Sequence, residues 1–335
     1  MKIRTLVAGL LYTVFLAMSA ALHAQTYSTN SDRVTVHPDN GNGDIPPIRV
    51  LTGAAAGISI AGPIALDVAN GEMFVVPNSL DDRVRVFPIN ADGNVAPVRE
   101  LDGANTGIDR ASGLAVDPIN DELYVVSADG DSIRVFDRTA DGDVAPLRTI
   151  EGPSTGLDFT NGIFVDLAND EILVTGNQIE GVLVFPRLAN GDVAPIRNLS
   201  GAATGLASSQ WLFVSNEHDE IYVSDRSGSV RVFNRTVTGN IAPLRIIAGV
   251  QTLLEQPQGI FLRNDGELVV GEENGRILVF DRLAEGNVSP NQVIQGAATQ
   301  LTSTYGVAGL NAAEGAVGFV GPIFRYSDGF ESSLP

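Results

Sequence analysis

The sequence predicts an all-β fold made of six copies of one four-stranded unit. The motif ADGDVAPLR at residues 140–148 recurs with small changes at 91–99, 189–197 and 238–245. Each copy is accompanied by short runs of β-branched and aromatic residues that are separated by turn residues, which is typical of strands. After residue 24, no segment shows the 3.6-residue apolar period of an amphipathic helix.

The spacing of the motif gives the size of the unit. Its last residue marks six positions: Arg49, Arg99, Arg148, Arg197, Arg245 and Gln292. The steps between these positions are 47–50 residues long. A repeat of this length that holds four strands is typical of a β-propeller blade. We therefore expect a six-bladed β-propeller of four-stranded antiparallel blades.

The unit at residues 113–152 shows the expected strands most clearly. They lie at 114–117, 122–126, 132–136 and 147–150, and would run in this order from the central axis to the rim. Apolar and polar residues alternate in the third run, which is the two-residue period of a strand. Asn-Asp, Asn-Gly or Asp-Gly pairs follow the first run in different copies, and such pairs favour hairpin turns.

The two ends of the chain predict how the ring closes. The N-terminal part begins with two outer strands, at 33–38 and 47–53, and the C-terminal part ends with two inner strands, at 305–311 and 316–321. Together they would form one blade. Because a single blade cannot cover both faces of its sheet, the ring has to be complete to be stable.

Residues 1–24 are expected to be a secretory signal peptide. Lys2 and Arg4 precede an apolar run, and Ala24 supplies the small residue before the cleavage point. The alternative is a membrane anchor, but the run is short for a span of about 20 apolar residues. The predicted organisation is then a linker at 25–32, the propeller at 33–326 and a C-terminal tail at 327–335. We expect the protein to be exported, to the periplasm or the exterior.

Composition excludes several classes of function. The formal net charge is −19, and it becomes −21 without residues 1–24, which hold two positive side chains and no negative one. Nucleic acids need clustered basic residues, so they are poor partners. The chain has no cysteine, and its sole lysine is Lys2, which excludes thiolate and Schiff-base chemistry. Only His37 and His218 remain after residue 24, too few for a zinc site or a usual catalytic base.

The repeated motif raises the alternatives of a turn and a calcium loop. Calcium takes six to eight oxygen ligands, whereas each copy offers at most two carboxylates and residues 238–240 offer none. We interpret the motif as a turn between the third and fourth strands. Pro146 would then begin an outermost strand with an unpaired edge. Arg148 would place a charge on that exposed edge and so discourage aggregation.

The stretch GLAVDPINDELYVVSADGDSIRVFDR, at residues 113–138, resembles the NHL repeat of six-bladed, TolB-like propellers. The resemblance covers about residues 33–325. It implies the fold without implying one activity, because such propellers include lyases, lactonases, receptors and interaction scaffolds.

The first candidate site is the mouth of the central channel. The residues just before the expected innermost strands would surround it: Gly62, Ser112, Asn161, Gln210, Gln258 and Tyr305. Most of these residues are polar, and they differ from one repeat to the next. A ring specialised for one ligand would show this variation. The alternative is a water-filled polar channel that binds nothing.

The second candidate site consists of carboxylates at the ends of two second strands. Asp225 and Glu272 occupy a position where the NHL repeat often carries Asp, and they are the best candidates for a metal or for an acid/base pair. Calcium would be that metal, and solvated surface acids are the alternative. In gluconolactonase-like propellers, Glu, Asn and Asp hold a channel metal. Asn161 together with the two carboxylates would imitate that set.

These observations predict a monomeric scaffold without cofactor or catalysis. It would bind an unidentified protein or small molecule through the channel-mouth face. The alternative function is a metal-assisted hydrolase or lactonase with a calcium-type site near the channel.

Overall fold

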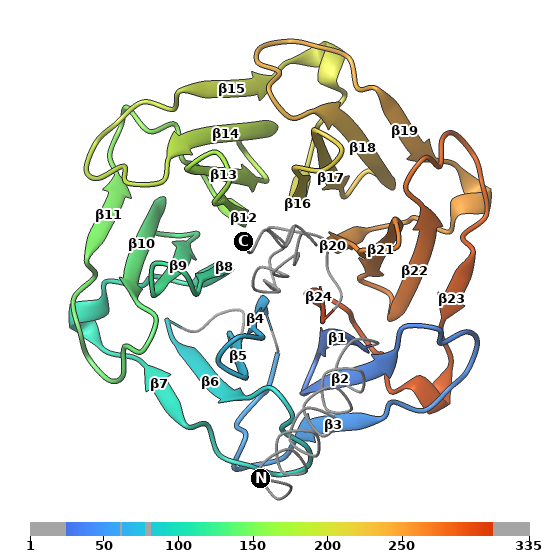
Figure 1. Cartoon of the computed structure of the whole chain (residues 1–335), viewed down its shortest axis with the longest axis horizontal. Coiled ribbons are helices and arrows are strands. Elements are labelled where there is room, and N and C mark those ends of the chain that lie inside the picture. The colour runs from blue at the N-terminus through green and yellow to red at the C-terminus, as the bar shows by residue number, and fades with distance from the viewer. Residues whose placement is uncertain (1–24, 61, 78–81, 311–335) are drawn as a thin grey trace, which may run out of the picture.

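The computed structural model describes residues 25–60, 62–77 and 82–310, and it forms a six-bladed β-propeller. Six four-stranded antiparallel sheets surround a central axis, as Figure 1 shows in a view along that axis. The predicted fold class is confirmed. In the third blade, the observed strands agree with the predicted ones to within three residues at each end.

Each blade runs from an innermost strand at the axis to an outermost strand at the rim (Figure 1). The first blade consists of β24 (Val307–Gly309), β1 (Gln25–Asn30), β2 (Arg33–Pro38) and β3 (Arg49–Thr52). The second consists of β4 (Ile64–Asp67), β5 (Glu72–Val75), β6 (Val84–Pro88) and β7 (Arg99–Leu101). The third consists of β8 (Ala111–Asp117), β9 (Glu122–Ser127), β10 (Ser132–Asp137) and β11 (Arg148–Glu151).

The remaining three blades follow the same order along the chain. The fourth consists of β12 (Thr160–Asp166), β13 (Glu171–Gly176), β14 (Gly181–Pro186) and β15 (Arg197–Ser200). The fifth consists of β16 (Ser209–Ser215), β17 (Glu220–Asp225), β18 (Ser229–Asn234) and β19 (Arg245–Ala248). The sixth consists of β20 (Pro257–Leu262), β21 (Glu267–Glu272), β22 (Arg276–Asp281) and β23 (Gln292–Ile294).

Short 3₁₀ helices follow four of the outermost strands. They are η1 (Ala104–Thr106), η2 (Ala202–Thr204), η3 (Val250–Thr252) and η4 (Ala297–Thr299). Within the described ranges, no helix has the length and apolar character needed to cross a membrane.

The first blade joins the two ends of the chain, but not in the predicted proportions. β1 pairs with β24 on one side and with β2 on the other, so the N-terminal part supplies three strands. The predicted linker at 25–32 is therefore wrong, since it contains β1. The expected strand at 305–311 is present as β24, and the one at 316–321 lies outside the described residues.

The polar composition of β1 explains the error. All six residues of QTYSTN are buried, although all of them except the tyrosine have small or amide-bearing polar side chains. Their side chains form hydrogen bonds within the first blade and to the start of the second blade. Thr26 Oγ1 donates to Asp39 at 2.9 Å, Ser28 Oγ lies 2.9 Å from the Thr35 hydroxyl, and Thr29 Oγ1 donates to the Gly62 carbonyl at 2.7 Å. A polar strand is stable here because its buried groups find partners.

Hydrophobic side chains fill the spaces between neighbouring blades. A phenylalanine at the end of the third strand recurs in five blades and is buried in each: Phe87, Phe136, Phe185, Phe233 and Phe280. Burying each such ring contributes about 1.5–3 kcal/mol. The first blade has His37 in the same position, and its side chain is also fully buried.

The repeated Gly motif clasps each blade to the previous one, which corrects the prediction of an unpaired outer edge. In the third blade, Gly142 N donates to the Glu100 carbonyl of β7, and the Gly142 carbonyl accepts from Asp102 N. The equivalent glycine N–H groups donate across the other blade boundaries at 2.6–2.7 Å: Gly43, Gly93, Gly191, Gly239 and Gly286. The loop therefore acts as an additional strand segment on its neighbour.

The residue after this glycine completes each clasp. In the fifth blade, Asn240 Oδ1 accepts from Ala203 N of η2 at 2.6 Å. Gly201, just before η2, has a φ of 116°, and a Cβ added there would lie 2.7 Å from the Asn240 side chain. At the other five boundaries, the backbone N–H of the residue two after such a glycine likewise donates to a side-chain oxygen, on Asp44, Asn94, Asp143, Asp192 or Asn287.

Replacing Gly201, the glycine that packs against Asn240, should lower the stability of the ring measurably. Gly201→Ala forces a side chain into a backbone region used almost only by glycine, and it pushes Asn240 away, so we expect a loss of about 2 kcal/mol. Asn240→Ala is the control, because it removes the hydrogen bond without straining the backbone and should cost about 1 kcal/mol. Urea unfolding measures both. Equal stability of Gly201→Ala and the unchanged protein would contradict the clasp.

The arginines of the motif are also not the exposed charges that the sequence suggested. Arg148 donates to both oxygens of Glu122 on β9, at 2.5 and 3.0 Å, and Arg187 of the next blade reaches the same carboxylate at 3.1 Å. Both arginines are mostly buried. The same arrangement holds at three more boundaries, through Glu72 with Arg99 and Arg138, Glu171 with Arg197 and Arg235, and Glu220 with Arg245 and Arg282.

Candidate functional site

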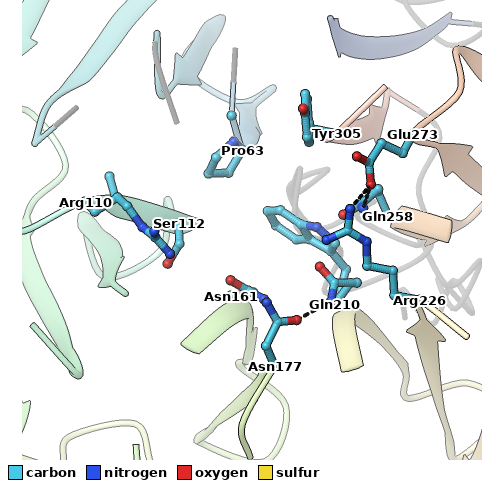
Figure 2. Close-up of a pocket in the computed structure, with 13 residues that line it drawn as sticks. Pro63, Arg110, Ser112, Asn161, Asn177, Gln210, Arg226, Gln258, Glu273 and Tyr305 are labelled. Carbon is cyan, nitrogen blue, oxygen red and sulfur yellow. Dashed lines mark hydrogen bonds and ion pairs between the residues drawn. The ribbon is translucent and has the colours of Figure 1, made fainter. Parts of the chain in front are cut away.

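A cavity of about 230 Å³ lies at one mouth of the central channel, where the innermost strands begin (Figure 2). The six residues predicted to surround the mouth all line it. The complete lining is Gly62, Pro63, Arg110, Ala111, Ser112, Asn161, Asn177, Gln210, Trp211, Arg226, Gln258, Glu273 and Tyr305. The arrangement of the ring is thus as expected, while its role in binding stays a prediction.

Close packing of neighbouring innermost strands brings these side chains together. Gly113 follows Ser112, and a Cβ at Gly113 would lie 2.2 Å from the carbonyl oxygen of Asn161 in the next blade. A Cβ at Gly162 would likewise lie 2.7 Å from the Gln210 carbonyl. Glycine is required because the backbone of one blade touches the start of the next. The polar residue before each glycine is therefore held at the mouth of the channel.

Three side chains in the cavity have no hydrogen-bond partner among the described residues. They are the Asn161 amide, the Tyr305 hydroxyl and the indole N–H of Trp211. Figure 2 shows Asn161 and Tyr305 on different sides of the central space. These three polar groups form no hydrogen bond that holds the fold together, so they are available to a ligand, although the Trp211 ring itself packs in the hydrophobic core.

The remaining polar residues are partly committed. Ser112 Oγ donates to the Thr160 carbonyl of the next blade at 2.7 Å. Gln210 Nε2 donates to Asn177 Oδ1, and Gln258 Nε2 donates to Glu273 Oε2 at 3.0 Å. Each glutamine bonds at least one N–H inside the protein and keeps the amide oxygen, which is an acceptor.

The charged residues of the lining are paired. Arg226 forms an ion pair with Glu273, as the dashed lines in Figure 2 show. Arg110 lies 3.4 Å from Asp129 and stacks over the Phe159 ring at 4.4 Å. The cavity therefore carries little net charge of its own, in a chain whose formal net charge is −19.

The sequence reasoning missed the other lining residues, and for two of them a signal was available. Trp211 and Pro63 occupy the position directly after the mouth residue, where four other repeats have glycine. A departure from glycine at that position indicates a side chain that enters the mouth. Asn177, Arg226 and Glu273 each come directly after a second strand, so the repeats align them, but only the folded loops show that they reach the mouth.

Asp225 and Glu272 lie at the ends of β17 and β21, but their carboxylates cap loops of their own blades. Asp225 Oδ2 accepts from Ala207 N at 2.8 Å and from Ser208 N at 3.0 Å. Glu272 Oε2 accepts from Glu255 N at 3.1 Å and from Gln256 N at 3.0 Å. Neither residue lines the cavity with Asn161.

The two capping carboxyls titrate differently because their donors differ. Burial alone would raise the pKa of Asp225, but hydrogen bonds from Ser227, Ser208 and Ala207 outweigh it and hold the pKa below its usual value. Burial raises the pKa of Glu272, because the backbone N–H groups of Gln256 and Glu255 offset it only in part. Within residues 25–60, 62–77 and 82–310, no three His, Asp or Glu side chains converge as metal ligands would. The arrangement favours capping over calcium binding.

Calcium should consequently leave the thermal stability unchanged. A ligand at 100 times its dissociation constant would add about 2.7 kcal/mol, and a domain of this size gains roughly 2–4 °C per kcal/mol. We expect melts of residues 25–335 in calcium, in EDTA and in neither to coincide within about 1 °C, well inside that scale. A calcium-dependent rise that Glu272→Gln abolishes would restore the metal hypothesis.

Comparison with known proteins identifies the fold. No family model and no curated protein sequence matches the chain. The structure is similar to the WD40 β-propeller domain of Doa1, with a TM-score of 0.54 and 12% identity over 82% of this chain and 80% of that one. It is also similar to a chain of the nidogen/laminin complex, with a TM-score of 0.62 and 10% identity over 85% and 97%. At these identities the likeness shows a β-propeller and leaves membership of the NHL/TolB-like group a prediction.

Proposed function

We propose that this protein is an exported, NHL/TolB-like propeller that binds a small molecule or a protein segment in the channel-mouth cavity without catalysing a reaction. The observation that carries the proposal is the set of unpartnered polar groups in that cavity, on Asn161, Tyr305 and Trp211. Cavities with a few convergent polar groups are the usual ligand sites of proteins.

The contrast between the outer rim of the propeller and the mouth of its channel supports the proposal. At the rim, the same residue types recur in most blades, and their polar atoms are occupied in clasps and ion pairs. At the mouth, the residue types differ between blades and several polar atoms are free. Repetition follows from the structural task that all blades share. Variation at one end fits recognition of a single ligand that lacks sixfold symmetry.

Export is part of the proposal and rests on the sequence. Residues 1–24 have the pattern of a secretory signal peptide, and β1 begins directly after them, at Gln25. Cleavage at that point would leave the first blade whole. The lactonase alternative needs Asn161, Asp225 and Glu272 around one metal. Because both carboxylates cap loops, no observation favours it.

Blocking the cavity tests the proposed function. Asn161→Trp places a large side chain in the mouth at a position with no structural hydrogen bond, so the melting temperature should stay the same. Native mass spectrometry of both proteins, purified from the exported fraction, should show a bound species on the unchanged protein alone. The same species on both proteins, or none on either, would contradict the proposal.

A further inference from the structure

The chemistry of the cavity indicates the class of ligand, an inference that rests on the proposed function. We propose that the cavity takes a compact, electrically neutral ligand rich in hydroxyl groups, of the kind a monosaccharide unit presents. Three properties of the lining support this: its paired charges, its mixture of hydrogen-bond donors and acceptors, and its aromatic residues.

The paired charges disfavour an ionised ligand. Arg226 is held by Glu273 and by Gln256, and Arg110 is held near Asp129 and over Phe159. Because these partners already balance part of each positive charge, a carboxylate or phosphate would compete with them for part of each guanidinium. An ammonium group would compete for Glu273 in the same way. A neutral ligand binds without breaking either pair.

The free hydrogen-bonding groups form a mixed set. The Asn161 amide offers donors and an acceptor, the Tyr305 hydroxyl offers both, and the indole of Trp211 is a donor. The two glutamines keep their acceptor oxygens, and each bonds at least one N–H within the protein. A hydroxyl donates one hydrogen bond and accepts two, so a polyol satisfies such a set. A ligand with acceptors alone would leave the free acceptors of the cavity unpaired, which weakens binding.

Aromatic residues and size complete the argument. Trp211, Tyr305 and Pro63 give the cavity apolar surfaces, and the Trp211 side chain is held in place because the residue is only 7% exposed. The face of an indole suits the C–H groups of a sugar ring, while its N–H suits a hydroxyl. The volume of about 230 Å³ is below the 300–1,000 Å³ that is usual for larger ligands. One compact ring therefore fits better than a long folded molecule.

Trp211 provides the readout, because it is the sole tryptophan of the chain and lines the cavity. The experiment titrates the full chain with neutral monosaccharides and disaccharides, and follows intrinsic tryptophan fluorescence. We expect a saturable change with at least one of them. Asn161→Ala should weaken that binding at least about tenfold, with the melting temperature unchanged. Asn291→Ala is the matched control, since Asn291 is exposed on the rim, and it should bind like the unchanged protein.

The outcomes separate this inference from the proposed function. No fluorescence change with any neutral saccharide would overturn the inference, as would a change that Asn161→Ala leaves intact. A saturable response to acidic sugars, nucleotides or peptides in place of neutral saccharides would also overturn it, yet would leave a ligand site at the mouth. The proposed function itself fails only if blocking the cavity with Asn161→Trp alters no bound species.

Discussion

Deleting residues 25–53 should abolish cooperative folding of the propeller. The deletion removes β1, β2 and β3, which leaves β24 without a partner in its blade. It also removes the clasp in which Gly43 N donates to the Val293 carbonyl of β23. Four fully or nearly fully buried apolar side chains are lost, namely Tyr27, Val34, Val36 and Leu51. At about 1.5–3 kcal/mol each, their burial is worth about 6–12 kcal/mol, comparable to the whole stability of a domain.

Size-exclusion chromatography and thermal melts of residues 25–335 and 54–335 measure this effect. The shorter protein should aggregate or melt without a cooperative transition, because the faces of the second and sixth blades are exposed. Adding a peptide of residues 25–53 should restore part of the transition. A monomeric 54–335 protein that melts like the longer one would show that the ring does not need the first blade.

Acid should destabilise the contact between the first and sixth blades through His37. This residue occupies the buried position of phenylalanine in the other five blades, and its Nε2 lies 3.1 Å from the Thr299 carbonyl of the sixth blade. A carbonyl accepts hydrogen bonds, so Nε2 carries the hydrogen and the buried Nδ1 has no partner. Burial lowers the pKa of His37 to about 4, and the Thr299 hydrogen bond offsets this only in part.

The direction of the pH effect follows from this shift. The unfolded chain binds a proton at the usual pKa of about 6.5, whereas the folded protein binds it only near pH 4. The stabilisation is complete above pH 6.5 and is lost as the pH falls toward 4. Its size is about 3 kcal/mol. Asp39 and Glu272, whose pKa values are raised by burial, act in the opposite direction.

Comparing variants isolates the histidine from these carboxyls. His37→Phe restores the residue that the other blades use, and urea unfolding at pH 7 and pH 4.5 should show a smaller loss of stability than in the unchanged protein. His218→Gln is the control, because it removes a histidine from the turn between β16 and β17, away from the contact between the first and sixth blades. If His37→Phe loses as much stability as the unchanged protein on acidification, His37 is not the acid-sensitive group.

The fold could be predicted because it depends on local patterns that repeat. The motif around Arg148 has a fixed spacing, and turn residues separate alternating strands, so six blades could be counted directly. Interactions between blades could not be predicted in this way. The bond from Gly142 to β7 and the ion pair from Arg187 to Glu122 join residues about 40 and 65 positions apart. Only the closed ring brings them together.

In the candidate site, too, some features could be predicted from the sequence and others could not. The channel-mouth residues follow from the alignment of the repeats, because the start of an innermost strand has to lie at the mouth in every blade. The predicted role of Asp225 and Glu272 depended on carboxylate chemistry alone. Their partners are backbone N–H groups of residues such as Ala207 and Gln256, which every sequence contains and no residue type reveals.

The most direct test of the account compares Asn161→Ala with Asp225→Ala in thermal melts. We assign Asn161 to ligand binding and Asp225 to structure. Asn161→Ala should therefore melt within about 1 °C of the unchanged protein. Asp225→Ala leaves the Ala207 and Ser208 N–H groups without their acceptor, and should lose about 2 kcal/mol, or roughly 4–8 °C. A large loss for Asn161→Ala together with none for Asp225→Ala would contradict the assignment of the channel mouth as the binding site.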